Sequence, residues 1–444
     1  MPGILGLLQS AQNNEIIMTS RLRGKALQCV GVMGSSVGID IFQNDAVHVL
    51  ELLMPSMSCD AGFPEGYFEY LAPACATIAK ALGSNFKQFL PMVIPPLLHT
   101  LNLEVEVSVT EFDGDLNNAD DEENDPNYDE SSGVQSTILN VKGRGQMKVT
   151  MNTTAVLEKQ LAAKTIYEYV ECLNENMIDY IESCMTTCLP LVCFRYSEDV
   201  RGSASFAVGK LFSSACKIVS LNLKPIEYAL QLLPSCIEAL TVGLSGERHH
   251  EPRCCMSEAL RDILQACFES SQKGHSINLS YHQAKELLSN KLLICVNECL
   301  KRRFVKSKEF EESDELEDDD MERLEEELEE EEELMTNLVD CIGYLLKAQS
   351  IHHQNHMIEL FDQCVIPIFS PLLLSNQPNS LRHNALCLYD DMIEFGGSQG
   401  EKYICPLIPS LMHELEYSTS GEDGTNCPYL LQVSAYGIMQ IAKL

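Results

Sequence analysis

The chain of 444 residues is short of positive charge and has no tryptophan. It carries 31 lysines and arginines against 65 aspartates and glutamates, which gives a formal net charge of -34. Nucleic-acid binding depends on a basic footprint that faces the phosphates. The composition therefore argues against direct nucleic-acid binding. It favours cationic protein segments as partners, because the summed negative field attracts them.

Motifs of the commonest enzyme sites are also absent from the chain. It has no P-loop, no Gly-rich dinucleotide turn after a strand, no Gly-x-Ser-x-Gly elbow and no His-Glu-x-x-His pair. No basic segment followed by an apolar run opens the chain, and no stretch approaches a membrane span. We therefore expect no enzyme activity, no cofactor and no membrane insertion.

Cysteine is abundant, with 19 residues, but the cysteines are scattered through amphipathic segments. This pattern is typical of small buried side chains in a reducing compartment, here the cytoplasm, the nucleus or both. Cys184 and Cys188 share a helix face beside Cys193, and no basic neighbour is available there to activate a thiol. We expect these cysteines to pack in the core.

A paired-helix pattern recurs along the chain. The first helix of each pair carries a proline and the second opens near an arginine, as in Leu232-Leu-Pro234, Leu407-Ile-Pro409, Val200-Arg201-Gly and Leu381-Arg382-His. A period of roughly 40–47 residues built from helix pairs is the signature of HEAT and armadillo repeats. We therefore predict an all-α fold: a single HEAT-repeat α-solenoid over residues 1–444, a superhelix of about seven helix pairs.

The pattern predicts a lone second helix at 18–36, and then the pairs. First helices are expected near 41–57, 85–102, 176–195, 225–243, 280–304, 353–374 and 400–416. Second helices are expected near 65–83, 155–171, 199–217, 251–269, 332–347, 379–396 and 426–443. Asp199 is expected to cap the helix that follows it. The prolines are expected to bend the first helices rather than end them.

Two segments interrupt the repeats. The first, at 103–153, has an acidic stretch around Asp120-Asp-Glu-Glu123, then an alternating polar and apolar stretch that predicts a β-hairpin near 136–151. The second, at 309–334, contains Glu317-Asp-Asp-Asp320 and Glu329-Glu-Glu-Glu-Glu333. Self-repulsion favours disorder over 111–133 and 309–322. Later residues of the second insertion, with Leu324 and Leu334, are expected to continue into the following helix.

Histidines gather at two places, His352 to His356 and His249-His250. Zinc sites need three or four convergent ligands. We find no cysteine or carboxylate at a supporting spacing, so we expect no metal site and interpret these histidines as solvated helix starts.

Carboxylates recur on the predicted second helices. If these helices line the inside of the superhelix, their carboxylates form one concave wall, and their recurrence across units favours a binding role over ordinary surface charge. Our candidates for contacts with a basic cargo protein are Glu65, Glu69, Glu258, Asp262, Asp390, Asp391 and Glu394.

Several segments resemble repeats of the importin β3 (importin-5-like) karyopherins. They are Leu22-Arg-Gly-Lys-Ala-Leu-Gln-Cys-Val-Gly-Val-Met-Gly-Ser-Ser-Val-Gly38, Leu388-Tyr-Asp-Asp-Met-Ile-Glu394 and Ala435-Tyr-Gly437. The order of the two acidic insertions also matches. The resemblance runs over nearly the whole chain and is similar to the middle-to-C-terminal HEAT-repeat portion of such a receptor.

The resemblance implies a nuclear transport receptor that carries basic cargo such as ribosomal proteins and histones into the nucleus. It implies Ran-GTP and phenylalanine-glycine (FG) nucleoporins as partners of the full-length receptor, and a localisation in cytoplasm, nucleus and nuclear pore. We expect a fragment, because the chain begins close to a helix and ends inside one. The family's principal Ran-contact repeats lie outside such a fragment, so we expect this chain to bind Ran-GTP weakly or not detectably.

Two departures from the family pattern concern the mode of cargo binding. Several importins hold extended peptides with tryptophan and asparagine ladders, but this chain has no tryptophan. Cys75 stands where the family tends to have tryptophan, and Leu431 stands where an arginine is expected. These departures therefore favour electrostatic capture of cargo over a peptide ladder.

Two other functions remain open. A rigid HEAT scaffold of a multiprotein complex, as in phosphatase scaffolds, would have short uniform turns, and two long acidic insertions argue against it. An acidic histone chaperone shares the charge pattern but has no need of Ran.

Overall fold

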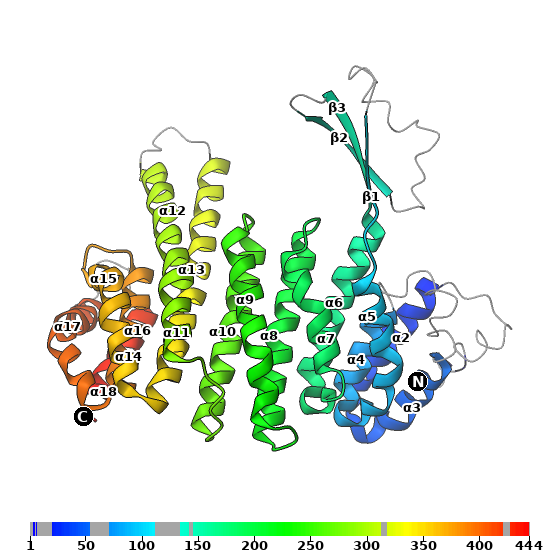
Figure 1. Ribbon diagram of the computed structural model, residues 1–444, viewed down its shortest axis with the longest axis horizontal. Helices are drawn as coiled ribbons and strands as arrows, with labels where there is room; N and C mark the ends of the chain where they lie inside the picture. Colours follow the sequence, from blue (N-terminus) through cyan, green and yellow to red (C-terminus); the bar gives the residue numbers. More distant parts are fainter. Residues whose placement is uncertain are drawn as a thin grey trace. The chain divides into compact units, whose positions relative to one another are not determined.

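The computed structural model describes residues 3–4, 6, 20–53, 71–111, 134–141, 145–311, 318–420 and 427–443. The chain divides into two compact units, Met1–Ser214 and Ala215–Leu444, and the boundary falls within one helix. Each unit is built from paired helices (Figure 1).

In the first unit the helices are α2 (Ser20–Val37), α3 (Ile39–Leu53), α4 (Ala72–Leu82), α5 (Leu90–Asn102), α6 (Thr153–Leu173), α7 (Ile181–Cys188) and the first part of α8 (Glu198–Ser220). The second helices of successive pairs pack on one another, α2 on α4 and α4 on α6, while α5 packs on α7. Ile78, Phe86 and Tyr169 are fully buried, and the rings of Phe86 and Tyr169 stack at 5.5 Å. Each helix thus buries an apolar stripe against its neighbours.

A small sheet is inserted between α5 and α6 (Figure 1). β2 (Val134–Val141) and β3 (Gly145–Asn152) pair antiparallel with Thr137 opposite Val149, so the predicted hairpin is confirmed. A third strand, β1 (Val107–Glu111), pairs with the other edge of β3 and was not predicted. The buried Lys159 of α6 donates to the carbonyl oxygens of Thr100 and Leu101 at 3.0 and 2.7 Å, which caps α5 where the chain leaves for the sheet.

In the second unit the helices are α9 (Ile226–Gly246), α10 (His250–Gln272), α11 (Tyr281–Leu287), α12 (Leu293–Glu311), α13 (Asp318–His352), α14 (Gln354–Leu360), α15 (Ile366–Phe369), α16 (Asn379–Phe395), α17 (Ile404–Ser420) and α18 (Pro428–Ile441). The second helices α10, α13, α16 and α18 pack in this order and form one layer. The first helices pack against them, α9 on α10, α12 on α13 and α17 on α18. The paired-helix prediction is confirmed in both units.

Two of the recurring arginines, Arg201 and Arg382, join the two helices of a pair. The guanidinium of Arg201 donates to the carbonyl oxygen of Phe194 at 3.0 Å, and that of Arg382 donates to Ser375 at 3.2 Å. Each bond reaches back seven residues, to the end of the first helix. The repeated arginine thus satisfies a carbonyl group that the first helix leaves unpaired at its end.

Prolines lie inside three helices without ending them, as predicted, whereas α7 (Ile181–Cys188) ends just before Pro190, which lies in the 3₁₀ turn that follows. Helices α5, α9 and α17 continue through Pro95, Pro234 and Pro409. The expected cap at Asp199 is wrong: α8 begins earlier, at Glu198, and the hydroxyl oxygen of Ser197 accepts from the backbone N–H of Val200 at 3.3 Å.

Helix α13 starts at Asp318, so the later residues of the second insertion continue into it, as predicted, and the helix also includes residues 318–322, where disorder was expected. Leu324 and Leu334 are buried, and Arg302 of α12 forms a bidentate pair with the buried Glu331 at 2.6 and 3.0 Å. These contacts offset the repulsion between the acidic side chains. Disorder was therefore the wrong expectation for 309–311 and 318–322, which are helical. Residues 112–133 and 312–317 lie outside the described residues.

The cysteine prediction holds for Cys184 and Cys188, which are fully buried, whereas Cys193 is exposed. Burial raises the pKa of the Cys184 thiol to about 12, which keeps it protonated and unreactive.

The expectation that no stretch approaches a membrane span is wrong for α9. By length and composition, this helix alone in the described part of the chain is long and apolar enough to cross a membrane. Its apolar residues Leu233, Cys236 and Leu240 are buried, and it packs on α10. Core helices of globular proteins commonly have this composition.

Candidate binding face on the second helices

The second helices of the second unit present a polar face, called the second-helix face below. It consists of Glu258, Arg261 and Asp262 of α10, Asn337, Asp340, Tyr344 and Lys347 of α13, Asp391 and Glu394 of α16, and Tyr436 of α18. On each helix these residues recur at steps of three or four, so they share one side. Carboxylates outnumber cations on the described part of this face.

Arg261 organises the α10 part of the face. Its Nη2 donates to Glu258 at 2.8 Å and to Asp262 at 3.0 Å, and its Nη1 donates to Asn337 of α13 at 3.3 Å. The guanidinium therefore holds both predicted carboxylates in place and joins two neighbouring helices. All three charged side chains keep between a quarter and two fifths of their surface exposed.

Lys347 connects α13 to α16. Its Nζ lies 3.1 Å from the carboxylate of Asp391 and 4.4 Å from the centre of the Tyr344 ring. Burial raises the pKa of Asp391 to about 6, although Lys347 acts in the opposite direction. Asp391 is thus a half-buried carboxylate that depends on its lysine for charge compensation.

Asp390 is not a surface carboxylate, which corrects the sequence-based expectation. It is 2% exposed, and its oxygens have no hydrogen-bond partner among the residues that the structure describes. Its carboxyl group packs against Gly437 of α18, where an added Cβ would lie 2.4 Å from Oδ1. Burial raises its pKa to about 8, and the charges of Asp391 and Glu394 add to this shift. Asp390 therefore presents no carboxylate to a partner.

Glu394 is the most accessible of the α16 carboxylates. It is exposed and accepts a hydrogen bond of 2.7 Å from the hydroxyl of Tyr436 on α18. The structure thus brings together two groups of predicted residues, Glu258 with Asp262 and Asp391 with Glu394. Glu65 and Glu69 lie outside the described residues.

The two histidine clusters differ in their surroundings. The rings of His353 and His356 lie 4.7 Å apart, with the ring of Tyr281 beside His356 at 4.6 Å. The statement that no cysteine stands at a supporting spacing is wrong for His250, because Cys254 follows one helical turn later and its Sγ lies 3.1 Å from Nε2.

Sequence reasoning also missed an apolar groove between the first helices α9 and α11. Its cavity measures about 340 Å³ and is lined by residues that include Ile237, Val242, Leu279 and Leu287. Glu238, Glu286 and Lys291 add a charged rim. The apolar lining residues come from different repeats, so no local motif predicts the groove.

No family model matches the chain. It is 23% identical over 420 residues to importin subunit beta-3 of Saccharomyces cerevisiae, which covers 93% of this chain and 34% of the yeast protein. It is 20% identical over 453 residues to the probable importin-5 homolog of Dictyostelium discoideum, and this match covers 99% of the chain and 36% of that protein. The chain resembles a segment of an importin β3 karyopherin. It spans about a third of the length of these relatives.

Solved structures confirm the fold prediction. The karyopherin Kap121p bound to the SUMO protease Ulp1p matches 100% of this chain and 36% of Kap121p, with a TM-score of 0.69 and 20% sequence identity. Kap121p structures with Nup53p and with RanGTP match with TM-scores of 0.67 and 0.66. The chain therefore has the HEAT-repeat solenoid fold of these karyopherins.

Proposed function

We propose that this chain is a segment of a nuclear transport receptor and that its second-helix face binds basic segments of cargo proteins. The observation that carries the proposal is the excess of carboxylates on this face, spread over α10, α13 and α16. The similarity to importin β3 supports the class of protein. Ribosomal proteins and histones are our candidate cargo, in the cytoplasm and nucleus.

The face suits a lysine-rich segment for a physical reason. Glu258 and Asp262 are held by Arg261, and Glu394 is oriented by Tyr436, so these groups need little reorganisation to meet a cation. Each exposed charge pair contributes only about 0.2–1 kcal/mol. A segment that spans α10 to α16 makes several pairs at once, and their sum supplies the affinity.

Nucleoporins are the second class of partner in this proposal. The apolar groove between α9 and α11 has room for an aromatic side chain, which fits a phenylalanine-glycine repeat. Kap121p itself has been solved with Nup53p and with RanGTP. We propose FG nucleoporins and Ran-GTP as partners of the whole receptor.

Charge reversal tests the cargo face. In the double variant Asp391→Lys and Glu394→Lys, affinity for a lysine-rich peptide should fall by more than about tenfold. Two carboxylates that attract the peptide are replaced by two ammonium groups that repel it. The matched control is Glu227→Lys with Glu238→Lys, two exposed carboxylates of the first helix α9. Fluorescence anisotropy at several salt concentrations gives both affinity and salt dependence.

Wild-type binding should weaken steeply as salt rises past physiological strength, where the screening length is about 8 Å. Equal losses in the two double variants would mean that net charge, not the face, governs binding. A pulldown from lysate with and without Ran-GTP separates the classes: release of basic proteins favours transport, whereas a stable phosphatase or kinase partner favours a scaffold.

A further inference from the structure

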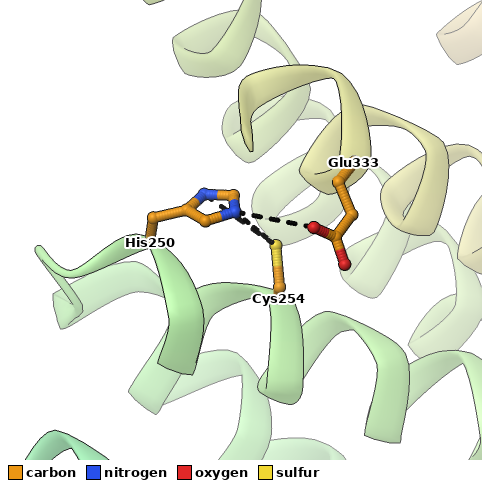
Figure 2. A group of neighbouring side chains, drawn as sticks. All are labelled: His250, Cys254 and Glu333. Carbon is orange, nitrogen blue, oxygen red and sulfur yellow. Dashed lines mark hydrogen bonds and ion pairs between the residues drawn. The ribbon is translucent and has the colours of Figure 1, made fainter. Parts of the chain in front are cut away.

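Three side chains with different metal-binding groups converge between α10 and α13. They are the imidazole of His250, the thiol of Cys254 and the carboxylate of Glu333 (Figure 2). Nε2 of His250 lies 3.1 Å from Sγ of Cys254 and 3.9 Å from Oε2 of Glu333. One ligand atom from each residue lies within 4.8 Å of the other two.

The fold holds these groups in place. His250 and Cys254 are four residues apart on α10, which puts them on one helix face. Glu333 comes from α13, the next second helix, and these two helices pack along their length. Cys254 is 7% exposed, the His250 side chain is 15% exposed and the Glu333 side chain is 65% exposed. The cluster is thus closed on the thiol side and open to solvent on the carboxylate side.

We propose that His250, Cys254 and Glu333 bind a divalent transition metal ion, with zinc as the best fit. Imidazole nitrogen, thiolate sulfur and carboxylate oxygen are the three ligand types that zinc uses in proteins. With bond lengths of about 2.0–2.3 Å, tetrahedral ligand atoms lie about 3.3–3.6 Å apart. The separations of 3.1 and 3.9 Å from Nε2 of His250 lie on either side of this range, and the third pair of ligand atoms lies within 4.8 Å, so metal binding requires side-chain rotation, above all of the exposed Glu333.

Coordination balances charge at this point. Burial raises the pKa of the Cys254 thiol well above its usual range, and the charge of Glu333 adds to this, so the free thiol is protonated. On binding, the metal ion replaces the thiol proton, which leaves to solvent, and a metal–sulfur bond forms. His250 contributes the lone pair of Nε2, and Glu333 contributes a carboxylate oxygen. The exposed side leaves the fourth position for water.

A thiol–imidazole hydrogen bond alone accounts for the contact between Cys254 and His250. It does not account for Glu333, an exposed side chain on another helix that meets the same nitrogen. Glu330, one turn before Glu333 on α13, adds further negative charge close to Cys254. A bound cation stabilises this arrangement, because the cation neutralises the carboxylates and links α10 to α13.

Metal titration of the full 444-residue chain tests the site. After removal of metal with a chelator, Zn²⁺ affinity is measured by competition with a chromophoric chelator, and Co²⁺ reports ligand type by absorbance. We expect one tight equivalent, a thiolate-to-cobalt charge-transfer band and a higher melting temperature with Zn²⁺. Cys254→Ser should weaken binding by more than the 10–100-fold typical of outer-shell changes, and remove the band.

Glu333→Gln changes an exposed residue, so it tests the site without endangering the fold, and its affinity should also fall at least tenfold. Matched controls are Cys255→Ser and Glu329→Gln, sequence neighbours that are not part of the cluster. Both should bind as the wild type does. Absence of one saturable equivalent, a cobalt spectrum without the thiolate band, or equal affinity in Glu333→Gln and Glu329→Gln would overturn the proposal, the last because the acidic stretch as a whole would be the binder.

Discussion

The carboxylates of α10 and those of α16 look alike in sequence, yet the structure places them in different surroundings. Glu258 and Asp262 share a half-exposed arginine and stay in contact with solvent. Asp390 is buried and has no hydrogen-bond partner among the described residues, and Asp391 depends on Lys347. A carboxylate on a second helix therefore belongs to a binding face only if the neighbouring helix leaves it exposed to solvent.

The largest difference in stability between the α10 and α16 carboxylates is expected when each is replaced by lysine. Asp390→Lys should destabilise the second unit by about 3–5 kcal/mol, because it places an unpaired ammonium group in a buried position. Glu258→Lys should cost less than about 1 kcal/mol, because that side chain is 38% exposed. Urea denaturation followed by circular dichroism measures both. Similar costs at the two positions would show that Asp390 is not buried in solution.

A neutral substitution at Asp390 tests the burial of this carboxyl group through the pH dependence of stability. The folded-state pKa of Asp390, about 8, lies above the ordinary value of about 3.9 in an unfolded chain. Between these values folding takes up a proton, so the stability contributed by the protonated carboxyl is full at low pH and is lost as the pH rises towards 8.

Asp390→Asn lacks this titration. The free energy of unfolding of this variant should be close to that of the wild type at pH 4 and should exceed it by more than about 1 kcal/mol at pH 8. Melting temperatures at pH 4, 6 and 8 provide the measurement, and a pH-independent difference would contradict the burial argument.

The smallest effect is expected for substitution of Lys347, the lysine that pairs with Asp391 of α16. Lys347→Met keeps the aliphatic stem over Tyr344 but removes the charge that pairs with Asp391, so the pKa of Asp391 should rise above about 6. We expect a loss of about 1 kcal/mol at pH 8 and almost none at pH 4, where the Asp391 carboxyl of the folded protein is protonated with or without Lys347.

Lys301→Met, an exposed lysine of α12, is the control for this substitution and should change stability by less than about 0.5 kcal/mol at either pH. Equal costs for the two lysines at pH 8 would mean that the contact between Lys347 and Asp391 contributes nothing beyond a surface pair.

The helices were predictable because each has to bury an apolar stripe, and that stripe is written in local sequence. Ala385, Leu388 and Met392 follow the helical period and are all buried. The start of α13 was not predictable in the same way. Its acidic turns are stable because Arg302 of another helix pairs with Glu331, a contact between residues 29 positions apart.

The candidate sites were predictable only in part. The four-residue spacing of His250 and Cys254 is visible in the sequence, but Glu333 lies on α13, the second helix of the next pair. Nothing local links it to the other two. The carboxylates of α16 were identified by residue type, whereas their exposure depends on α18, which covers Asp390 with a glycine and meets Glu394 with a tyrosine.

By itself, the sequence determined the paired helices, the hairpin, the negative charge and the resemblance to the importin β3 karyopherins, because periodicity, composition and motifs are local properties. Only the tertiary structure decided which carboxylates are accessible, which cations compensate them, what the repeated arginines bond to and where His250, Cys254 and Glu333 meet. Those properties depend on distances between side chains from different helices, and stacking of the repeats sets these distances.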